Sequence, residues 1–381
     1  MTVNIDEARD LGVYLHFPWC RKRCPYCDFA IELGPPAHDA YLDAIGRELG
    51  LRAAGFTGEL VSIYLGGGTP SLWRPDCIAA AIDQIRRRFG APAEAALEVT
   101  LEANPTDCSA ANLAAWRAAG INRISIGVQS FAPRDLVVLG RDHRFGDGRA
   151  AIERTIAAGF TTSADFIFGV AGTPELPAAA GPPALDTAPD HLSVYELTIE
   201  DRTAFGKRVR DGRLVPQPED TLAELYLAID ARLTAAGYEH YEISSYARPG
   251  KRAVHNALYW RGAAFLGLGV GAASLELAAD GSGRRATNPR RASDYLASPG
   301  APAEIVVSSP EELAADRAWL GLRTCDGVAE ADLAPAAGVA DWLVAERLAD
   351  RRGGRICPTL RGFLMADRIA ARVVESWGAK L

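Results

Sequence analysis

The sequence lacks the features that would mark a membrane, secreted or nucleic-acid-binding protein. No segment approaches the roughly 18 consecutive apolar residues that a membrane-spanning helix needs. The first residues, MTVNIDEARD, have neither the basic nor the apolar region of a secretory signal peptide, so we expect a cytoplasmic protein. Lys and Arg (41) are fewer than Asp and Glu (48), and the resulting net charge of −7 disfavours nucleic acid as a partner.

The composition is that of a globular protein. The chain has 381 residues, of which 48% are hydrophobic and 23% are charged, and these values exclude a disordered or collagen-like chain. Because domains usually hold roughly 100 to 200 residues, the length favours two domains, or one large α/β barrel with an appendage.

Short strand-like runs alternate with Ala- and Leu-rich segments that have the apolar spacing of helices. About six such units occur before residue 200. They suit a parallel sheet curled into a partial (β/α)6 TIM-type barrel, although an open doubly wound sheet has the same local pattern. The predicted strands cover residues 12–17, 61–65, 97–103, 123–128, 161–168 and 191–198.

Two changes in composition divide the rest of the chain. Prolines between Ala171 and Pro189 predict that the helix expected there is weak or broken, which loosens the barrel at that point. The Gly-rich stretch 262–271 and the polar, basic segment 281–291 then indicate a boundary. We therefore predict a barrel domain of residues 1–290 and a small C-terminal domain of residues 300–381. The small domain reads as mainly helical and winged-helix-like, with Thr359 as the cap of its last helix.

Three of the seven cysteines form a cluster directly after the first predicted strand. Cys20, Cys24 and Cys27 have the spacing C-x3-C-x2-C, whereas the other four are scattered. Loops at the carboxyl ends of barrel strands carry chemistry. Structural zinc and all-protein cubane clusters take four protein ligands, so three cysteines leave one metal position open. The alternatives are a zinc site completed by His16 or Cys77, and three unrelated buried thiols.

Polar and glycine residues at the ends of the following strands form a second candidate group. Leu65-Gly-Gly-Gly-Thr-Pro70 is neither a Walker A loop nor a G-x-G-x-x-G fingerprint, and it would let backbone amides approach a ligand or simply make a tight turn. Glu102, Gln129 and Asp165 each end a predicted buried strand. A buried polar side chain needs a partner, which is either another protein group or a ligand.

One histidine stands beside two aromatic residues. His255-Asn256 precedes Tyr259-Trp260, which places a potential iron ligand next to flat aromatic surface and suits a porphyrin. A lone histidine is more often a hydrogen-bonded structural residue. We assign that structural role to His38, His143, His191 and His240.

The cysteine motif resembles the signature of radical S-adenosylmethionine (SAM) enzymes. The lead-in Tyr14-x-His16-x-Pro18-x-Cys20 and the run Cys24-Pro-Tyr-Cys-Asp-Phe29 are similar to the coproporphyrinogen oxidase-like branch, and within it to the HemW-type haem chaperones. The resemblance implies a [4Fe–4S] cluster on Cys20, Cys24 and Cys27, with SAM on the fourth iron. It implies haem binding at His255. It also implies SAM contacts at Tyr14, Tyr26, Gly67, Gly68, Thr69, Glu102, Gln129, Arg141 and Asp165.

The resemblance implies a function as well. Haem is the expected cargo, and the expected acceptors are haem-requiring respiratory proteins at the membrane surface. The alternative enzyme is an oxygen-independent coproporphyrinogen III oxidase, and the alternative binding protein is a non-catalytic metal module. In the oxidases a further cysteine occupies the position of Phe29, so we predict no oxidase activity and expect the Phe29 ring to pack against the barrel core. Whether the protein is a monomer or a dimer stays open.

Overall fold

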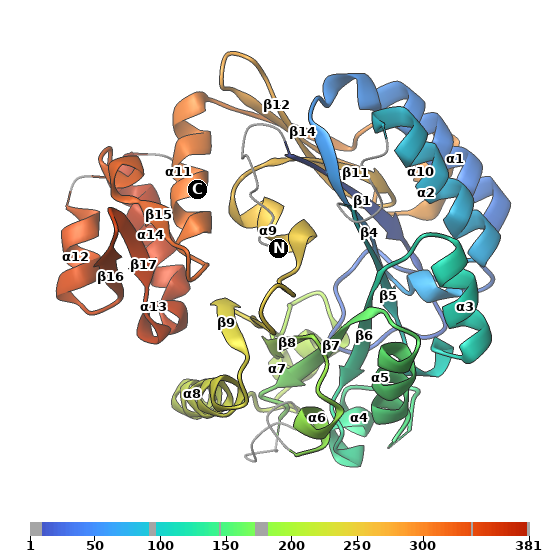
Figure 1. The fold of residues 1–381 in the computed structure, drawn as a ribbon, viewed down its shortest axis with the longest axis horizontal. Coiled ribbons are helices and arrows are strands. Elements are labelled where there is room, and N and C mark those ends of the chain that lie inside the picture. Colours follow the sequence, from blue (N-terminus) through green and yellow to red (C-terminus); the bar gives the residue numbers. More distant parts are fainter. Residues whose placement is uncertain (1–9, 91–96, 145, 172–181, 337, 379–381) are drawn as a thin grey trace.

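A large curved sheet with helices on its outer face forms most of the molecule, and a smaller unit lies beside it (Figure 1). The computed structural model describes residues 10–90, 97–144, 146–171, 182–336 and 338–378. Within these ranges the large sheet has 12 strands in the order β14-β13-β12-β11-β1-β4-β5-β6-β7-β8-β10-β9.

The centre of this sheet is parallel. Six strands lie side by side in chain order and pair in parallel, which confirms the predicted partial barrel. Their residues are buried almost throughout, as expected for parallel strands covered on both faces. They are β1 (Asp10–Phe17), β4 (Glu59–Gly67), β5 (Glu98–Ala103), β6 (Arg123–Gln129), β7 (Thr161–Phe168) and β8 (His191–Glu196).

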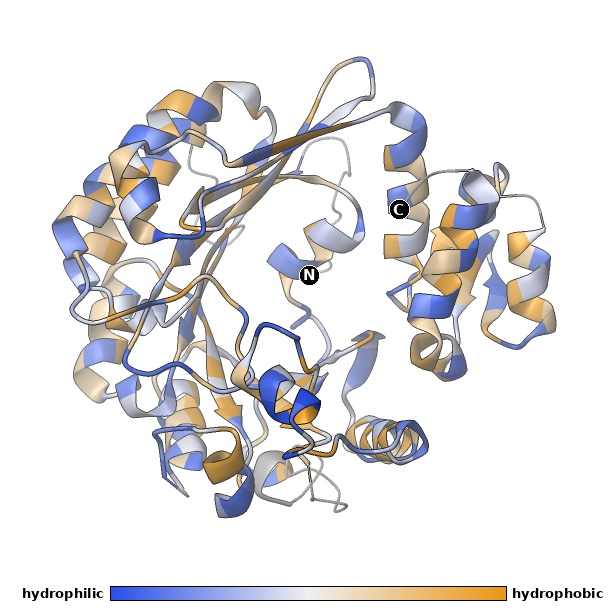
Figure 2. Cartoon of the chain, turned by 180° about the vertical axis from the view of Figure 1, so that it is seen from behind, coloured by the Kyte–Doolittle hydropathy of each residue, from blue (hydrophilic) through white to orange (hydrophobic). Residues whose placement is uncertain are grey.

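Amphipathic helices cover the outside of the sheet. In α2 (Pro75–Phe89), Ile78, Ile82 and Ile85 are buried at helical spacing. Figure 2 shows that the outer helices carry both hydrophobic and hydrophilic residues, as helices with one buried face do. None of the described helices is long and apolar enough to span a bilayer. The other helices of this part are α1 (His38–Arg52), α3 (Ala110–Ala118), α4 (Pro133–Val138), α5 (Asp147–Ala157), α7 (Ala204–Arg210), α8 (Glu219–Ala235) and α10 (Ala292–Ala297).

The proline-rich stretch contributes one short helix, α6 (Pro182–Thr187), of six residues. A weak or short helix is what the prolines predict. The first part of the stretch, residues 172–181, lies outside the described residues.

The sheet extends beyond the six predicted strands. β11 (Ala264–Gly269) pairs in parallel with β1 on the side away from β4, so the Gly-rich stretch is a strand rather than a connection. A side chain at Gly267 would place its Cβ 2.0 Å from the Ala273 carbonyl oxygen, which explains the glycine there. The edge strands β12 (Ala273–Leu277), β13 (Gly283–Thr287) and β14 (Glu304–Ser308) continue the sheet past the predicted division at residues 290–300, and β10 (Ser245–Ala247) and β9 (Glu239–Glu242) close the other edge.

The C-terminal unit has its own apolar core, which includes Leu343, Ile356 and Val373. Its three short strands pair antiparallel in the order β15-β17-β16, among four helices. This arrangement agrees with the predicted winged-helix-like unit. Thr359 accepts a hydrogen bond from the Gly362 amide and caps the short helix Leu360–Leu364. The prediction that it caps the last helix is wrong, because that helix, Ala366–Trp377, begins separately after Met365. The elements are α11 (Pro310–Gly321), β15 (Val328–Ala329), α12 (Val339–Ala345), β16 (Ala349–Arg352), β17 (Arg355–Pro358), α13 (Leu360–Leu364) and α14 (Ala366–Trp377).

Candidate functional site

The carboxyl ends of the parallel strands open onto a cavity of about 750 Å³, which we call the cysteine cavity. The structure brings together at this cavity every residue predicted to hold a cluster or SAM. Among the predicted site residues only His255 does not line it. The predicted residues in its lining are Tyr14, Cys20, Cys24, Tyr26, Cys27, Gly67, Gly68, Thr69, Glu102, Gln129, Arg141 and Asp165.

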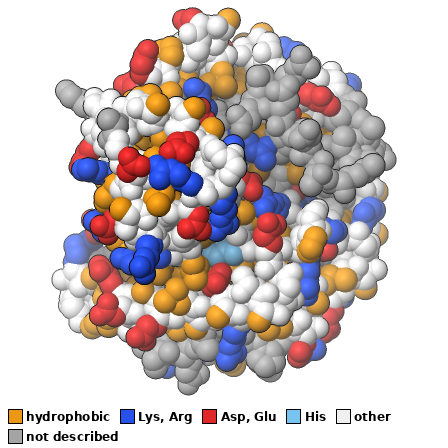
Figure 3. Space-filling view, turned by 60° about the vertical axis from the view of Figure 1, so that its left-hand side comes forward, with side chains coloured by type: hydrophobic (Ala, Val, Ile, Leu, Met, Phe, Trp, Pro, Cys, Tyr) orange, Lys and Arg blue, Asp and Glu red, His pale blue; other side chains and the backbone are white. Residues whose placement is uncertain are grey.

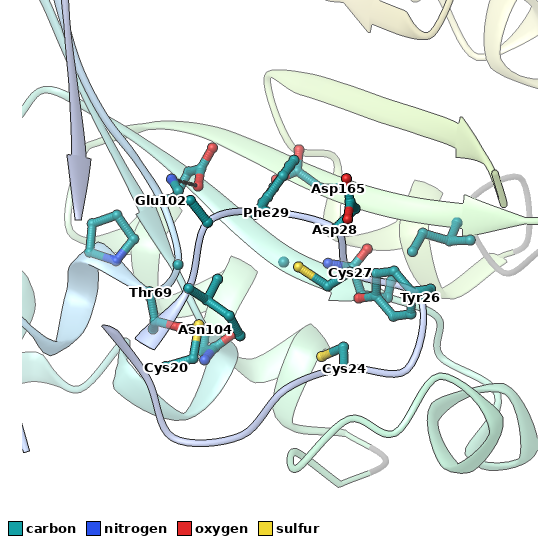
Figure 4. A pocket seen from close by; sticks show the side chains of 18 of the residues that line it. Cys20, Cys24, Tyr26, Cys27, Asp28, Phe29, Thr69, Glu102, Asn104 and Asp165 are labelled. Atoms are coloured by element: carbon teal, nitrogen blue, oxygen red, sulfur yellow. Dashed lines mark hydrogen bonds between the residues drawn. The ribbon is translucent and has the colours of Figure 1, made fainter. Parts of the chain in front are cut away.

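A closed loop presents the three cysteines. The loop leaves β2 (Trp19–Cys20) and returns through β3 (Glu32–Leu33), which pairs with β2, and the Glu32 amide donates to the Pro18 carbonyl at 2.9 Å. Inside the loop the Cys27 amide donates to the Cys24 carbonyl at 3.2 Å. The three cysteines are half-buried, and Figure 4 shows them spaced along the loop.

The thiols sit among hydrogen-bond donors. The Thr69 hydroxyl lies 3.4 Å from the Cys20 sulfur, and Arg141 Nη1 lies 3.7 Å from the Cys24 sulfur. Burial raises the pKa of Cys20 to about 11 and raises the pKa of Cys27 as well. These thiols therefore need a bound cation to hold them as thiolates, and the nearby donors suit thiolate ligands.

The geometry bears on the type of metal group. A single zinc ion requires its sulfur ligands to converge on one atom at about 2.3 Å. Among the residues that the structure describes, no three His, Cys, Asp or Glu side chains are placed to do so. A cubane takes one thiolate on each of three separate irons. Cys20, Cys24 and Cys27 line one cavity and have no disulfide partner, so all three thiols are available for this purpose.

Arg141 provides a donor that no described residue uses. Its Nη2 donates to Asn104 Oδ1 at 2.7 Å and to the Gly127 carbonyl at 3.0 Å, which fixes the guanidinium. Its buried Nε has no hydrogen-bond partner in the described part of the chain. Because a buried unpaired N–H costs about 1 to 3 kcal/mol, this atom marks the place of a ligand acceptor. The carboxylate of SAM is such an acceptor.

Two half-buried carboxyl groups, those of Glu102 and Asp165, line the cavity. The Tyr64 hydroxyl donates to Glu102 Oε1 at 2.8 Å and the Gly67 amide donates to Oε2 at 3.1 Å. The Ser125 hydroxyl donates to Asp165 at 2.8 Å. Burial raises the pKa of Glu102 to about 7 and raises that of Asp165. Each carboxylate has lone pairs beyond these bonds, so both can accept from a ligand hydroxyl or ammonium group.

The glycines at the end of β4 allow neighbouring strands to pack closely, a role that the sequence alone does not show. A Cβ at Gly67, whose φ is +109°, would come within 2.5 Å of the His16 ring, so β4 can approach β1 only with glycine there. The Gly67 amide bonds Glu102 and the Gly68 amide bonds the Phe17 carbonyl at 2.8 Å. The amides of Gly67 and Gly68 are therefore already used by the protein, which favours the tight turn over a ligand contact through these two N–H groups.

Gln129 adopts a strained backbone conformation at the cavity wall. Its φ of +64° lies in the left-handed region, at an irregularity in the pairing of β6 with β7. For a residue other than glycine this conformation costs about 1 to 3 kcal/mol and is concentrated at functional sites. The backbone thus supports the predicted ligand contact of this residue.

The structure does not support the prediction that His255 ligates haem, because the residue lies outside the cysteine cavity and both its ring nitrogens are bonded. His255 lies on α9 (Val254–Trp260) and is 1% exposed. Its Nδ1 is 2.8 Å from the Ser62 hydroxyl and its Nε2 is 2.8 Å from the Tyr259 hydroxyl, so neither nitrogen is free for iron. Burial lowers its pKa to about 3, and its ring stacks on Tyr64 with 5.1 Å between centroids. We call this buried group, made of Ser62, Tyr64, His255 and Tyr259, the α9 plug.

Phe29 also departs from its prediction. Its side chain is 61% exposed and lines the cysteine cavity instead of packing against the core, and it follows Asp28 on the cysteine loop (Figure 4).

Three further residues of the cavity support its predicted ligand-binding residues, and of these only His16 had been considered, as a ligand of the alternative zinc site. His16 fixes the loop through a 2.8 Å hydrogen bond from its Nε2 to the Ala30 carbonyl. Asn104 orients Arg141, and Ser125 orients Asp165. Asn104 follows Glu102 at the end of β5, so the search for polar residues at strand ends could have found it.

Figure 3 shows basic and acidic side chains interspersed over the face in view.

The comparisons with known proteins point to one family. The radical SAM superfamily matches residues 14–176. A protein of Mycobacterium tuberculosis named "Heme chaperone HemW" is 38% identical over 377 residues, which cover 95% of this chain and 94% of that protein. The Escherichia coli protein of the same name is 38% identical over 75% of each chain. The solved structure of coproporphyrinogen III oxidase (HemN) from Escherichia coli is similar in fold, with a TM-score of 0.77 at 24% identity over 96% of this chain and 90% of that one.

Proposed function

Because the chain belongs to the HemW family of haem chaperones within the radical SAM superfamily, we propose that it binds haem and delivers it to haem-requiring respiratory proteins. The observation that carries this proposal is the 38% identity, which extends over nearly the whole of this chain and of its relative in Mycobacterium tuberculosis. The acceptors at the membrane surface and the cytoplasmic location belong to the same proposal.

Members of the radical SAM superfamily use SAM and a [4Fe–4S] cluster. In this chain Cys20, Cys24 and Cys27 hold the cluster, whose fourth iron supplies an open coordination position for SAM. Arg141 binds the SAM carboxylate through its free Nε, while Glu102 and Asp165 accept hydrogen bonds from ligand hydroxyl or amino groups. The remaining contacts are assigned to Tyr14, Tyr26, Gly67, Gly68, Thr69 and Gln129.

The second candidate function is oxygen-independent coproporphyrinogen III oxidation. Its support is the fold that the chain shares with the Escherichia coli oxidase, and at 24% identity this likeness concerns the fold alone. Phe29 argues against it, because an exposed phenyl ring can act neither as a metal ligand nor as a proton or hydrogen donor.

A transfer assay separates the two functions. Anaerobically reconstituted protein, loaded with haem and freed of excess ligand, is mixed with an apo-cytochrome, and the Soret band of the product is followed. We expect haem transfer, and no protoporphyrinogen IX from coproporphyrinogen III with SAM and reductant. Turnover above the background without protein, in an assay that a genuine oxidase passes, contradicts the proposal, as does failure of the wild type to bind haem.

A further inference from the structure

An exposed aromatic ring stands at the rim of the cysteine cavity. Phe29 is 61% exposed although its ring is large and apolar, and full burial of such a side chain is worth about 1.5 to 3 kcal/mol. Tyr195, at the end of β8, is 43% exposed and lines the same cavity. Apolar surface left open beside a cavity is typical of a ligand-binding site.

Two arginines converge on the residue before this ring. Arg202 Nη2 lies 2.7 Å from the Asp28 carboxylate, and Arg290 Nη2 donates to the Asp28 main-chain carbonyl at 2.6 Å and lies 3.8 Å from its carboxylate. The three side chains together carry one net positive charge, next to Phe29 in the chain. The Arg202 and Arg290 side chains are 72% and 53% exposed, so water reaches both.

The arginines retain unused donors. A guanidinium has five N–H groups in a planar fork that matches a carboxylate. In each arginine only Nη2 contacts Asp28, so further N–H groups remain to bind an anion from solution. Arg202 follows β8 and Arg290 follows β13, so two segments far apart in the chain both contact Asp28, the residue before Phe29.

Carboxylates also line the cavity. Glu196 is the last residue of β8, and Glu200 follows that strand in the chain. A ligand carboxylate at the rim is attracted by the guanidinium groups of Arg202 and Arg290 and repelled by these carboxylates.

Building on the proposed function, we propose that Phe29, Arg202 and Arg290 form the haem docking surface of this protein. The Phe29 ring lies against the porphyrin face, and the two guanidinium groups bind a propionate carboxylate. This assignment places haem at the mouth of the cysteine cavity and not at the α9 plug, where both nitrogens of His255 are already bonded.

The test combines changes in the protein with changes in the ligand. Full-length reconstituted protein is titrated with haem and with haem dimethyl ester, in which both propionates are neutral, and affinity is read from the Soret band. We expect Phe29→Ala to weaken both ligands by about 3- to 10-fold, because ring contacts do not depend on the propionates. The double variant Arg202→Ala/Arg290→Ala weakens haem by a similar factor and the ester by less than 2-fold.

Matched controls remove a side chain of the same type elsewhere on the surface. Val137→Ala deletes a 79% exposed apolar group, and Arg87→Ala deletes an exposed arginine that pairs with Asp83, and both should bind like the wild type. Phe29→Leu keeps an apolar group if the alanine variant folds poorly, and iron content per chain checks that the cluster loop is intact.

The outcomes are distinct. If the wild type does not bind haem, the proposed function fails. If it binds haem but the Phe29 and arginine variants bind like the controls, the docking surface is wrong while the function stands. An equal loss for haem and its ester in the arginine variant contradicts propionate binding.

Discussion

The cysteine cavity and the α9 plug both contain side chains that can bind a ligand. In the cavity one such group has no hydrogen-bond partner among the described residues, whereas in the plug the histidine is fully hydrogen-bonded to the protein. In the cavity a buried guanidinium nitrogen of Arg141 has no partner among the described residues, Gln129 has a strained backbone and Phe29 is exposed. In the plug both nitrogens of His255 are bonded to protein hydroxyls and the ring is stacked on Tyr64. The free Nε of Arg141 is available to a ligand that enters the cavity, whereas the ring nitrogens of His255 are already used by the protein.

The largest expected effect is the loss of bound iron when a cysteine of the cavity is replaced. Replacing Cys20, Cys24 or Cys27 singly with Ala should abolish or cripple cluster binding, because two thiolates cannot hold the cubane. Iron and acid-labile sulfide per chain measure this after anaerobic reconstitution. Cys325→Ala, which removes a half-buried thiol from the small domain, is the matched control and should keep its iron. Full iron content in all three single variants would refute the assignment.

The next largest effect concerns the plug. His255→Ala leaves the Ser62 and Tyr259 hydroxyls without a partner and opens a cavity, so we expect a loss of about 2 to 4 kcal/mol in the free energy of unfolding. Haem affinity of the folded variant should not change. Urea unfolding and Soret titration measure the two quantities, with His38→Ala as a control near the surface. A stable variant with altered haem binding would reverse our interpretation of the plug.

The carboxyl group of Glu102 predicts a pH dependence. Burial raises its pKa from 4.5 to about 7, so between these values the native state binds more protons than the unfolded state. The contribution of this group to stability is therefore present at low pH and is lost as the pH rises through about 7.

Glu102→Gln should remove this dependence. At pH 8 the variant should gain about 1 to 3 kcal/mol relative to the wild type, and at pH 4 the difference should vanish. Urea unfolding of the metal-free protein at the two pH values measures the change. An equal difference at both pH values would contradict a titrating Glu102.

The smallest expected effect comes from replacing Gln129, where backbone strain and ligand binding should change in opposite directions. Gln129→Gly relieves the left-handed conformation and should raise the free energy of unfolding by about 1 kcal/mol, while SAM affinity falls because the amide side chain is lost. Equilibrium dialysis with SAM and urea unfolding measure the two changes. A variant that loses stability as well as affinity would show that the side chain of Gln129 stabilises the fold.

The sequence predicted the regular part of the fold and the residues of the cavity. The strand at 161–168 agrees with β7 at both ends, since buried parallel strands bounded by glycine and charged residues are clear patterns. The strand β11 was not predicted, because glycines lower strand propensity. Gly267 is needed in this strand because a side chain there would collide with the carbonyl oxygen of Ala273 on β12.

The expectations that the structure does not support concern the surroundings of a side chain, which means its burial and its hydrogen bonds, and not the chemistry of the residue itself. His255 was selected because an imidazole can ligate iron, and Phe29 was expected to pack in the core because its ring is apolar, but burial and hydrogen bonding decide what each side chain does. Ser62, which bonds His255, is 193 residues away in the chain, so no local pattern shows that the histidine is already satisfied.

A structure of the anaerobically reconstituted protein with SAM tests the central comparison most directly. The account predicts iron bound to the sulfurs of Cys20, Cys24 and Cys27, a ligand oxygen on Nε of Arg141, and His255 still bonded to Ser62 and Tyr259. Iron at other residues, or a His255 ring turned away from its two hydroxyl partners toward a bound group, would contradict it.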